Sequence, residues 1–338
     1  MTRLAVGEGE AYVPIVQRSH AIWRELEDAT GATLFHRTGG LIMGPQDGTQ
    51  DHHGKPDFVR RTIDNARRFA IPHEVLRAGE VAKRYPQFLV RGDELAYFEA
   101  DSGVLLPERC IDAQLGQART LGARVRFDEK VLAIEEHGGT TTVRTAAGTY
   151  SAAKVIVTAG AWIPQMTTGA VRANLRVLRQ TLHWFGTSDP GLYGPQRCPI
   201  FIWMHGDGPE DPMYGFPMVD GKQGVKVAGE QYRSVSPPDD YAREVTDAES
   251  AHMYDAHVAG RLRAVTRNTV HRAACLYTVS TDSGFIVDTY RDMESVTVVS
   301  ACSGHGFKHS AGLGESLARA TVGERVAELE PFTARRFG

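Results

Sequence analysis

The segment from Ala274 to Glu315 constrains the fold more than any other part of this 338-residue chain. A β-rich run there ends at the glycine-punctuated turn Ser303-Gly-His-Gly-Phe-Lys308, and a helix is expected to begin at that turn. Glycines let backbone N–H groups come close to a flat or anionic ligand, and Lys308 adds positive charge where the helix dipole is also positive. The pattern therefore predicts a site that stabilises negative charge on a delocalised ligand.

The composition narrows the class of protein. A hydrophobic content of 42% and a charged content of 23% are typical of a soluble globular enzyme, and the chain is long enough for two domains. A net charge of −3 gives no reason to expect a nucleic acid or a membrane as partner. No apolar run approaches the roughly 20 residues of a membrane span. The four cysteines lack disulfide-framework spacing, so we expect free thiols in a cytoplasmic protein.

Hydrophobic periodicity predicts an interleaved order of helices and strands. We expect helices over residues 11–28, 57–70, 107–122 and 248–265, short strands over 124–127, 131–135, 141–145 and 154–158, and further strands across 176–227. Runs such as Val155-Ile-Val157 are typical of strands buried on both faces, whereas the later strands alternate with Pro- and Gly-rich loops. This mixture predicts two domains, each built from several separate segments.

Several segments resemble those of the monomeric sarcosine oxidase and N-methyltryptophan oxidase family, which are FAD-dependent amine oxidases of the D-amino acid oxidase superfamily. The matching segments lie in collinear order along nearly the whole chain: Gly7-Glu-Gly-Glu-Ala-Tyr-Val-Pro14, Glu99-Ala-Asp-Ser-Gly-Val104, Val155-Ile-Val-Thr-Ala-Gly-Ala-Trp162, Tyr214-Gly-Phe-Pro217, Cys275-Leu-Tyr277, Phe285-Ile-Val-Asp288 and the turn at 303–308. The resemblance implies a mixed α/β (α+β) fold of the D-amino acid oxidase type. It implies an FAD-binding domain over 1–34, 104–169 and 284–332, and a substrate domain with a mainly antiparallel sheet over 35–103 and 170–283.

In that family, the segment matching Gly7-Glu-Gly9 follows a strand–GxGxxG–helix unit that binds the nucleotide. The chain opens without such a unit. One interpretation is a start placed downstream of the natural one, and the other is a shortened chain that binds FAD poorly or not at all. Because loss of a central strand and its helix would expose a sheet edge and apolar faces, we favour the first interpretation.

The resemblance also assigns the cofactor-binding residues. Cys275 matches the residue that attaches FAD through a thioether, and nearby positive charge is expected to lower the pKa of its thiol. The other cofactor-binding positions are Val131, Gly160, Trp162, Tyr277, Gly304, His305, Gly306, Phe307 and Lys308. Without the resemblance, we would interpret Cys275 as a small buried hydrophobic residue and Val131 as an ordinary strand residue.

The same resemblance implies catalytic and substrate-binding roles. Lys226 matches a lysine beside the flavin, where a buried cation stabilises the negative charge that develops on oxygen. Arg3 and Lys308 match a clamp for the substrate carboxylate. Tyr214 and Tyr277 match aromatic residues that line the substrate cavity, although tyrosines in such segments are also common in cores.

Glu230 departs from the family pattern, because it stands where the relatives have an active-site histidine. Either the alignment is displaced, or Glu230 is a harmless surface acid, or it lines the cavity with a catalytic role. In the last case it would favour a cationic amine or a second basic group on the substrate, which argues against sarcosine itself. His205 is a weaker candidate to occupy the place of the missing histidine.

His305 and His309 have the four-residue spacing of a helical metal pair. Gly306 stands where a zinc protease needs its glutamate, and no third ligand is evident. We therefore predict no metal site.

The expected function is the FAD-dependent oxidation of a secondary, N-methyl amino acid by a monomeric enzyme. Oxygen would be the acceptor, and an imine or aldehyde and hydrogen peroxide would be the products. One alternative is a non-catalytic remnant that cannot hold FAD. Another is an amine dehydrogenase that passes electrons to a different acceptor, and Lys226 favours the oxidase over it.

Overall fold

The computed structural model describes residues 1–338 apart from 49–50, 207, 209, 222 and 291–292. Its helices are α1 (Val13–Thr30), α2 (Phe58–Arg68), α3 (Ala78–Arg84), α4 (Pro107–Thr120), α5 (Ile163–Met166), α6 (Gly169–Ala173), α7 (Asp247–Met253) and α8 (Ser310–Thr321). The 3-10 turns are η1 (Glu10–Tyr12), η2 (Gly160–Trp162), η3 (Pro190–Leu192), η5 (Phe307–His309), η6 (Ala327–Phe332) and η7 (Ala334–Phe337), and η4 (Tyr254–Val258) is a π-helical turn.

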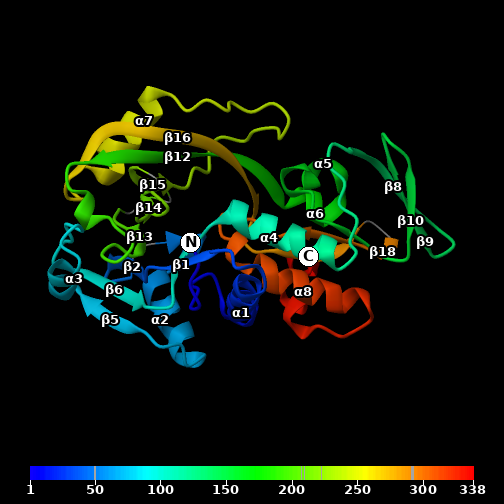
Figure 1. Cartoon of the computed structure of the whole chain (residues 1–338), viewed down its shortest axis with the longest axis horizontal. Helices are drawn as coiled ribbons and strands as arrows, with labels where there is room; N and C mark the ends of the chain where they lie inside the picture. Colours follow the sequence, from blue (N-terminus) through cyan, green and yellow to red (C-terminus); the bar gives the residue numbers. More distant parts are fainter. Residues whose placement is uncertain (49–50, 207, 209, 222, 291–292) are drawn as a thin grey trace.

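The largest sheet has eight strands. In spatial order they are β16 (Val265–Ser280), β12 (Leu175–Thr187), β15 (Val225–Gly229), β14 (Pro212–Phe216), β13 (Ile200–Met204), β2 (Gly40–Pro45), β6 (Glu94–Glu99) and β5 (Glu74–Arg77). Strands β13 and β2 run parallel, and the other neighbouring strands run antiparallel. The long β12 and β16 form an arch across the top of the molecule in Figure 1.

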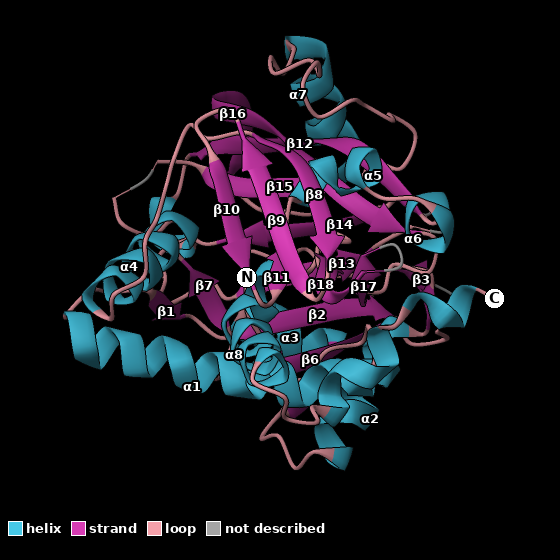
Figure 2. Ribbon diagram, turned by 90° about the vertical axis from the view of Figure 1, so that its right-hand side faces the viewer, coloured by secondary structure: helices cyan, strands magenta, loops and turns pink. Residues whose placement is uncertain are grey.

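Smaller sheets complete the fold. One has the order β11 (Val155–Val157), β18 (Met293–Ser300) and β17 (Ile286–Tyr290), and another has the order β10 (Thr149–Ala152), β9 (Thr140–Thr145) and β8 (Val131–His137). Two-stranded pairs are β1 (Phe35–Arg37) with β7 (Gly103–Leu105), and β3 (Asp51–His52) with β4 (Lys55–Pro56). Figure 2 shows α1, α2 and α8 along one side of the molecule, with β12, β16 and α7 on the other.

The strand register of the eight-stranded sheet places the side chains of one apolar cluster on one face and the side chains between them on the other face. Val225 and Val227 on β15, Phe201 and Trp203 on β13, and Met213 on β14 belong to one buried apolar cluster. Residues directly opposite each other on neighbouring strands share a face, and alternate residues of one strand share a face. The intervening residues therefore point to the other face of the sheet, which packs toward α1 and α2.

The helix predicted over 11–28 forms as α1, shifted by two residues at each end. Pro14 lies in the first turn, where its missing N–H costs nothing, and Gly31 ends the helix at a φ of 69°. The buried side of α1 packs closely on α8, because a Cβ atom at Gly312 would lie 2.4 Å from the carbonyl oxygen of Ile15. The N–H of Gly312 also donates to Ser19 Oγ at 2.8 Å. This contact fixes the helix that follows the 303–308 turn.

Two of the local predictions are wrong. No strand forms over 124–127, because this segment is an extended connection after α4 with mainly exposed residues. The helix predicted over 248–265 is shorter: α7 ends at Met253, and the chain then passes through the π-helical turn to β16. The helix predicted over 107–122 and the strands around 131–135, 141–145 and 154–158 are confirmed.

Candidate active site

Four of the predicted site residues lie on one face of the eight-stranded sheet. Lys226 on β15 pairs with Trp184 on β12. Two further residues of β12, four and six positions before Trp184 and therefore on the same face, pair with Cys275 and Tyr277 on β16. Tyr214 on β14 pairs with the residue two places after Lys226. The hydroxyl oxygens of Tyr214 and Tyr277 are 3.0 Å apart and hydrogen-bonded. The fold thus brings together side chains that are up to 63 positions apart in the sequence.

The ammonium group of Lys226 lies between two aromatic rings. It is 4.9 Å from the ring centre of Trp184 on one neighbouring strand and 4.8 Å from that of Phe216 on the other. Both rings present their faces to a cation, an attraction that strengthens as water is excluded. The contacts hold the positive charge against the sheet.

Cys275 does not have the acidic thiol that we expected. Burial raises its pKa to about 11, and the charge of Lys226 lowers it by less than burial raises it. The thiol is therefore protonated at neutral pH in the protein without a bound cofactor. The positive charge is near, as predicted, but removal from water outweighs it.

The 303–308 turn packs directly against this face. Ser303 and Gly304 have φ values of 42° and 80°, and the N–H of Ser303 donates to the carbonyl oxygen of Thr278 on β16. A Cβ atom at Gly304 would lie 3.0 Å from both the ring of Tyr277 and a carboxylate oxygen of Glu230. At Gly306, a Cβ atom would lie 1.7 Å from the carbonyl oxygen of Ala301. Both glycines are required by the close approach of the protein's own atoms.

Arg3 and Lys308, the predicted clamp, meet on the carboxylate of Glu8. Arg3 donates to both oxygens of Glu8 at 2.8 Å, and Lys308 donates to one of them at 3.2 Å. All three side chains are almost fully buried. The segment that carries Arg3 is fixed by Glu99, whose carboxylate accepts hydrogen bonds from the N–H groups of Leu4 and Ala5.

The electrostatics of this cluster leave an excess of positive charge. Burial lowers the pKa of Lys308 to about 8, although Glu8 opposes the shift. Burial alone would raise the pKa of Glu8, but Arg3 and Lys308 hold it well below its usual range. Below about pH 8, two cations therefore face one carboxylate. Nε of Arg3 is also buried without a hydrogen-bond partner in the described part of the chain.

The other residues of the turn point into the protein. Nε2 of His305 is 2.9 Å from the carbonyl oxygen of Ser283, and its ring stacks on Phe285. His309 is fully buried, and neither of its ring nitrogens has a partner among the described residues. Burial and the charge of Lys308 hold the pKa values of both histidines well below their usual range. The ring of Phe307 stacks on Trp23 of α1 instead of facing the sheet.

Glu230 is buried, so the interpretation as a surface acid is wrong. Oε1 of Glu230 is 2.6 Å from Nε2 of His53, and its other oxygen accepts a short hydrogen bond from the hydroxyl of Tyr232. Burial would raise the pKa of Glu230, but His53 and, more weakly, Tyr232 lower it to about 2. The carboxylate is thus ionised beside Gly304 and Tyr277.

The histidine beside Glu230 is His53, not His205 as we suggested. Nε2 of His205 is 3.0 Å from Nδ1 of His257, in a separate buried pair. His52 lies beside His53, with ring centres 4.0 Å apart, and burial lowers its pKa to about 3.

Three predicted cofactor-binding residues lie outside the group around Gly304. Val131 is 40% exposed on β8, in the sheet at the right-hand end of Figure 1. Gly160 and Trp162 form η2, beside β16, and Nε1 of Trp162 donates to Asp239 at 2.9 Å. Gly160 has a φ of 54°, and a Cβ atom added there would meet no described atom within 4 Å, so the space beside it is open.

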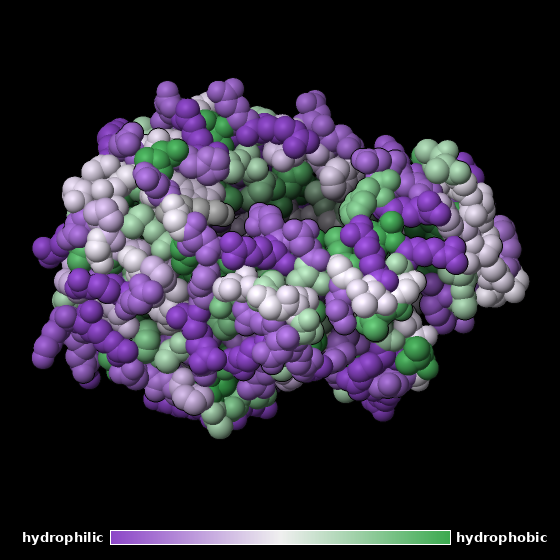
Figure 3. Space-filling view, viewed as in Figure 1, coloured by the Kyte–Doolittle hydropathy of each residue, from purple (hydrophilic) through white to green (hydrophobic). Residues whose placement is uncertain are grey.

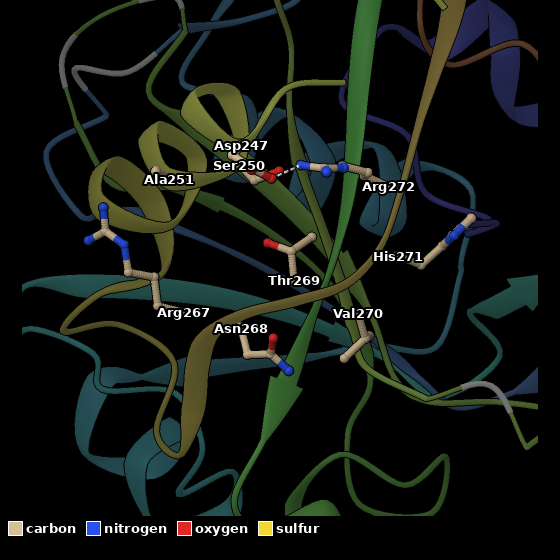
Figure 4. A pocket seen from close by; sticks show the side chains of 9 residues that line it. All are labelled: Asp247, Ser250, Ala251, Arg267, Asn268, Thr269, Val270, His271 and Arg272. Atoms are coloured by element: carbon tan, nitrogen blue, oxygen red, sulfur yellow. Dashed lines mark hydrogen bonds and ion pairs between the residues drawn. The ribbon is translucent and has the colours of Figure 1, made fainter. Parts of the chain in front are cut away.

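Two depressions mark this region of the surface. Figure 3 shows a hollow with apolar residues between the β12–β16 arch and α4. A separate groove of about 710 Å³ lies between α7 and the first half of β16 (Figure 4). Its two arginines are ion-paired, Arg272 with Asp247 and Arg267 with Asp255, and it contains none of the predicted site residues.

Comparisons with known proteins establish the family. The model of the family "FAD dependent oxidoreductase" matches residues 3–320. A monomeric sarcosine oxidase from Streptomyces avermitilis is 32% identical over 340 residues, which cover 99% of this chain and 85% of that protein. The chain belongs to the FAD dependent oxidoreductase family. An N-methyl-L-tryptophan oxidase from Yersinia pestis is 31% identical over 316 residues, covering 93% of this chain and 80% of that protein.

Solved structures of lower identity show the same fold. An L-proline dehydrogenase from P. horikoshii has a TM-score of 0.78 at 18% identity, covering 100% of this chain and 86% of that one. NikD, an amino acid oxidase of nikkomycin biosynthesis, has a TM-score of 0.75 at 18% identity, covering 94% of this chain and 82% of that one. The predicted mixed α/β, D-amino acid oxidase-like fold is confirmed. So is the prediction that the protein is a flavin-dependent amine oxidoreductase whose cofactor is FAD.

Three residues of this region, Glu8, His53 and Tyr232, were not predicted as site residues from the sequence. The acidic residue in Gly7-Glu8-Gly9 was visible, but nothing in the sequence indicates that it binds Lys308, 300 positions away. His53 lies in a polar, turn-rich segment without a recognisable pattern. Within the described residues, no helix is both long and apolar enough to cross a membrane.

Proposed function

We propose that this protein oxidises a secondary amino acid, most simply an N-methyl amino acid, and uses oxygen to give hydrogen peroxide. Two relatives are named for sarcosine and for N-methyl-L-tryptophan, which are both N-methyl amino acids. The observation that carries the proposal is the grouping of Lys226, Cys275 and Tyr277 on one sheet face, against the Gly304 turn.

The residues of this face suit the ring end of FAD, which is electron-poor and becomes more negative on reduction. The thiol of Cys275 shares the face with Tyr277 and with the cation of Lys226, and β16 runs beside η2. When bound, FAD would supply the redox chemistry by accepting a hydride equivalent, one proton with two electrons, from the substrate carbon next to nitrogen. The protein would then supply orientation and charge.

The positive cluster supports a role in binding the substrate carboxylate. Arg3 and Lys308 carry two positive charges against one negative charge on Glu8, and Nε of Arg3 is buried without a partner in the described residues. A second carboxylate would balance the charge and accept the remaining guanidinium donor. An amino acid, and not a simple amine, is the substrate class that offers this group.

Glu230 supports recognition of the amine. Its ionised carboxylate lies beside Tyr277 and Gly304, while His53 and Tyr232 hold it in place. A buried carboxylate attracts an ammonium group strongly because little water screens the charge. Tyr214 and Tyr277 would provide the aromatic wall between the two ends of the substrate.

Lys226 supports oxygen as the acceptor. Its ammonium is fixed between Trp184 and Phe216, so its charge would be in place before oxygen arrives. A preorganised cation of this kind stabilises negative charge developing on oxygen at no cost of reorganisation.

Cys275 is the proposed point of covalent attachment of FAD. The positive charge of Lys226 acts on this thiol and lowers its pKa, in opposition to burial. Binding of the cofactor beside the same lysine would bring the sulfur against the flavin ring. The four cysteines are free thiols, which agrees with a cytoplasmic location, and we propose that the enzyme acts as a monomer.

The two half-reactions test the proposal. Lys226→Met should slow reoxidation of the reduced enzyme by oxygen by roughly 10²-fold or more, while anaerobic reduction by N-methyl amino acids changes little. Stopped-flow absorbance measures both rates, and Lys83→Met, an exposed lysine on α3, is the matched control. Equal losses in both half-reactions would exclude the role of Lys226. Failure of every N-methyl amino acid to reduce the wild-type flavin would overturn the function.

A further inference from the structure

The β3–β4 hairpin places two histidines side by side in the protein interior. Successive residues of a strand normally point to opposite faces. His53, however, lies outside β3, because it forms the two-residue turn of the hairpin with Gly54, and its φ of 56° suits such a turn. As a result both imidazoles lie on the same side, with ring centres 4.0 Å apart, and both are more than nine-tenths buried.

Glu230, which directly follows β15, lies beside these two histidines. Nitrogen atoms of His52 and His53 and a carboxylate oxygen of Glu230 all lie within 4.8 Å of one another. We propose that His52, His53 and Glu230 form a binding site for a divalent transition metal ion of the Zn²⁺ class. Two imidazoles and one carboxylate are a donor set that Zn²⁺ prefers, and three protein ligands leave a fourth position open.

The three ligand atoms, which now lie within 4.8 Å of one another, must adjust to hold the ion. Zn²⁺ bonds nitrogen and oxygen ligands at about 2.0–2.2 Å, so two ligand atoms of a tetrahedral site lie roughly 3.3 Å apart. His53 Nε2 and Glu230 Oε1 are now 2.6 Å apart and would separate by less than 1 Å, roughly, to admit the ion. Tyr232 already binds the second oxygen of Glu230, and this kind of support orients a ligating carboxylate.

The surrounding charges leave Glu230 available for a cation. Arg3 and Lys308 are both engaged by Glu8, so neither forms an ion pair with Glu230 among the described residues. The proposed ligands are distinct from the His305 and His309 pair that the sequence suggested and that we rejected.

A metal at this position has a consequence for the oxidase, and this consequence rests on the proposed function. Glu230 lies against Gly304 and Tyr277, where we place the amine end of the substrate. Bound Zn²⁺ would remove the carboxylate from that role, so it should inhibit amine oxidation reversibly, and a chelator should restore the activity.

Metal counting tests the site without reference to flavin or activity. Chelator-treated full-length protein is dialysed against micromolar Zn²⁺, and bound zinc is measured by mass spectrometry of the metal. We expect about one Zn²⁺ per wild-type chain and less than a tenth of that in the His52→Ala/His53→Ala variant. The matched control His137→Ala/His252→Ala removes two exposed histidines and should keep its zinc.

Glu230→Gln provides a second variant of nearly the same shape, in case the histidine variant does not fold. It should weaken Zn²⁺ binding at least tenfold and abolish the rise in Tm that Zn²⁺ gives the wild type. Co²⁺ bound to the wild type should show the intense visible bands of a tetrahedral site. Absence of zinc from the wild type, or the same zinc content in the variants, would overturn the proposal and leave His53 and Glu230 as an ion pair only.

Discussion

Val225 and Val227 on β15 are fully buried in the apolar cluster, whereas Lys226, the residue between them, faces the opposite side of the sheet with two aromatic rings. The same division holds on the neighbouring strand β14, whereas on β13 and β2 the second face is apolar, with Ile202 and Ile42 buried against α1 and α2. One face carries Phe201, Trp203 and Met213, all at most 1% exposed. The other carries the half-buried polar side chains of the candidate site.

The difference shows how the fold positions its chemistry. A shift of one residue in strand register would bury Lys226 in the apolar cluster and bring valines to the site. The face that carries the buried apolar cluster, here called the dry face, therefore fixes the register of the strands. The register in turn fixes the positions of Lys226 and Tyr214. We expect substitutions on the dry face to change stability, and substitutions on the polar face to change chemistry.

The largest effect is expected on the dry face. Phe201→Ala removes a buried ring that covers Gly215 on the neighbouring strand, and it should lower the free energy of unfolding by about 3–5 kcal/mol. Tyr214→Phe, on the polar face of the next strand, loses the hydroxyl contact with Tyr277 and should cost about 1 kcal/mol. Urea unfolding measures both. Similar losses for the two variants would contradict the division between the faces.

A smaller effect is expected from pH at the positive cluster. The pKa of Lys308 is about 8, so its charge is present below that pH and is lost as the pH rises through it. Substrate carboxylate binding should weaken by roughly tenfold above this pH, the size expected for one charged hydrogen bond. The measurement is KM for the amino acid substrate as a function of pH.

Glu8→Gln sharpens the same test. Glu8 raises the pKa of Lys308 against burial, so its loss should move the rise in KM to lower pH. Glu10→Gln, an exposed neighbour that pairs with Arg68 at the surface, should leave the profile unchanged. A wild-type KM that stays constant as the pH rises through the pKa of Lys308 would show that Lys308 does not bind the substrate.

The sequence predicts the local features of the fold well. The helix predicted over 11–28 forms as α1, the strands predicted across 176–227 include β15 with Lys226, and the glycine-punctuated turn predicted at 303–308 separates β18 from α8. These features depend on neighbouring residues, whose preferences are readable without a structure. The family resemblance adds the identity of the site residues, which no local pattern contains.

The errors concern burial and long-range pairing. The pKa of the Cys275 thiol depends on how much of the protein covers it, and this overrides the nearby lysine. The contacts of Glu230 with His53 and of Lys308 with Glu8 join residues 177 and 300 positions apart. No periodicity records such contacts, so Glu230 could not be distinguished from a surface acid.

The most direct test of the account is the chemical state of Cys275 in protein purified with FAD. Acid precipitation followed by proteolysis and mass spectrometry will show whether the peptide that contains Cys275 carries a flavin. We expect a yellow precipitate and a flavin-linked Cys275 peptide from the wild type, and a colourless precipitate from Cys275→Ala. A flavin released from the wild type by acid, or attached to another residue, would contradict the placement of the flavin ring against the polar face of the sheet.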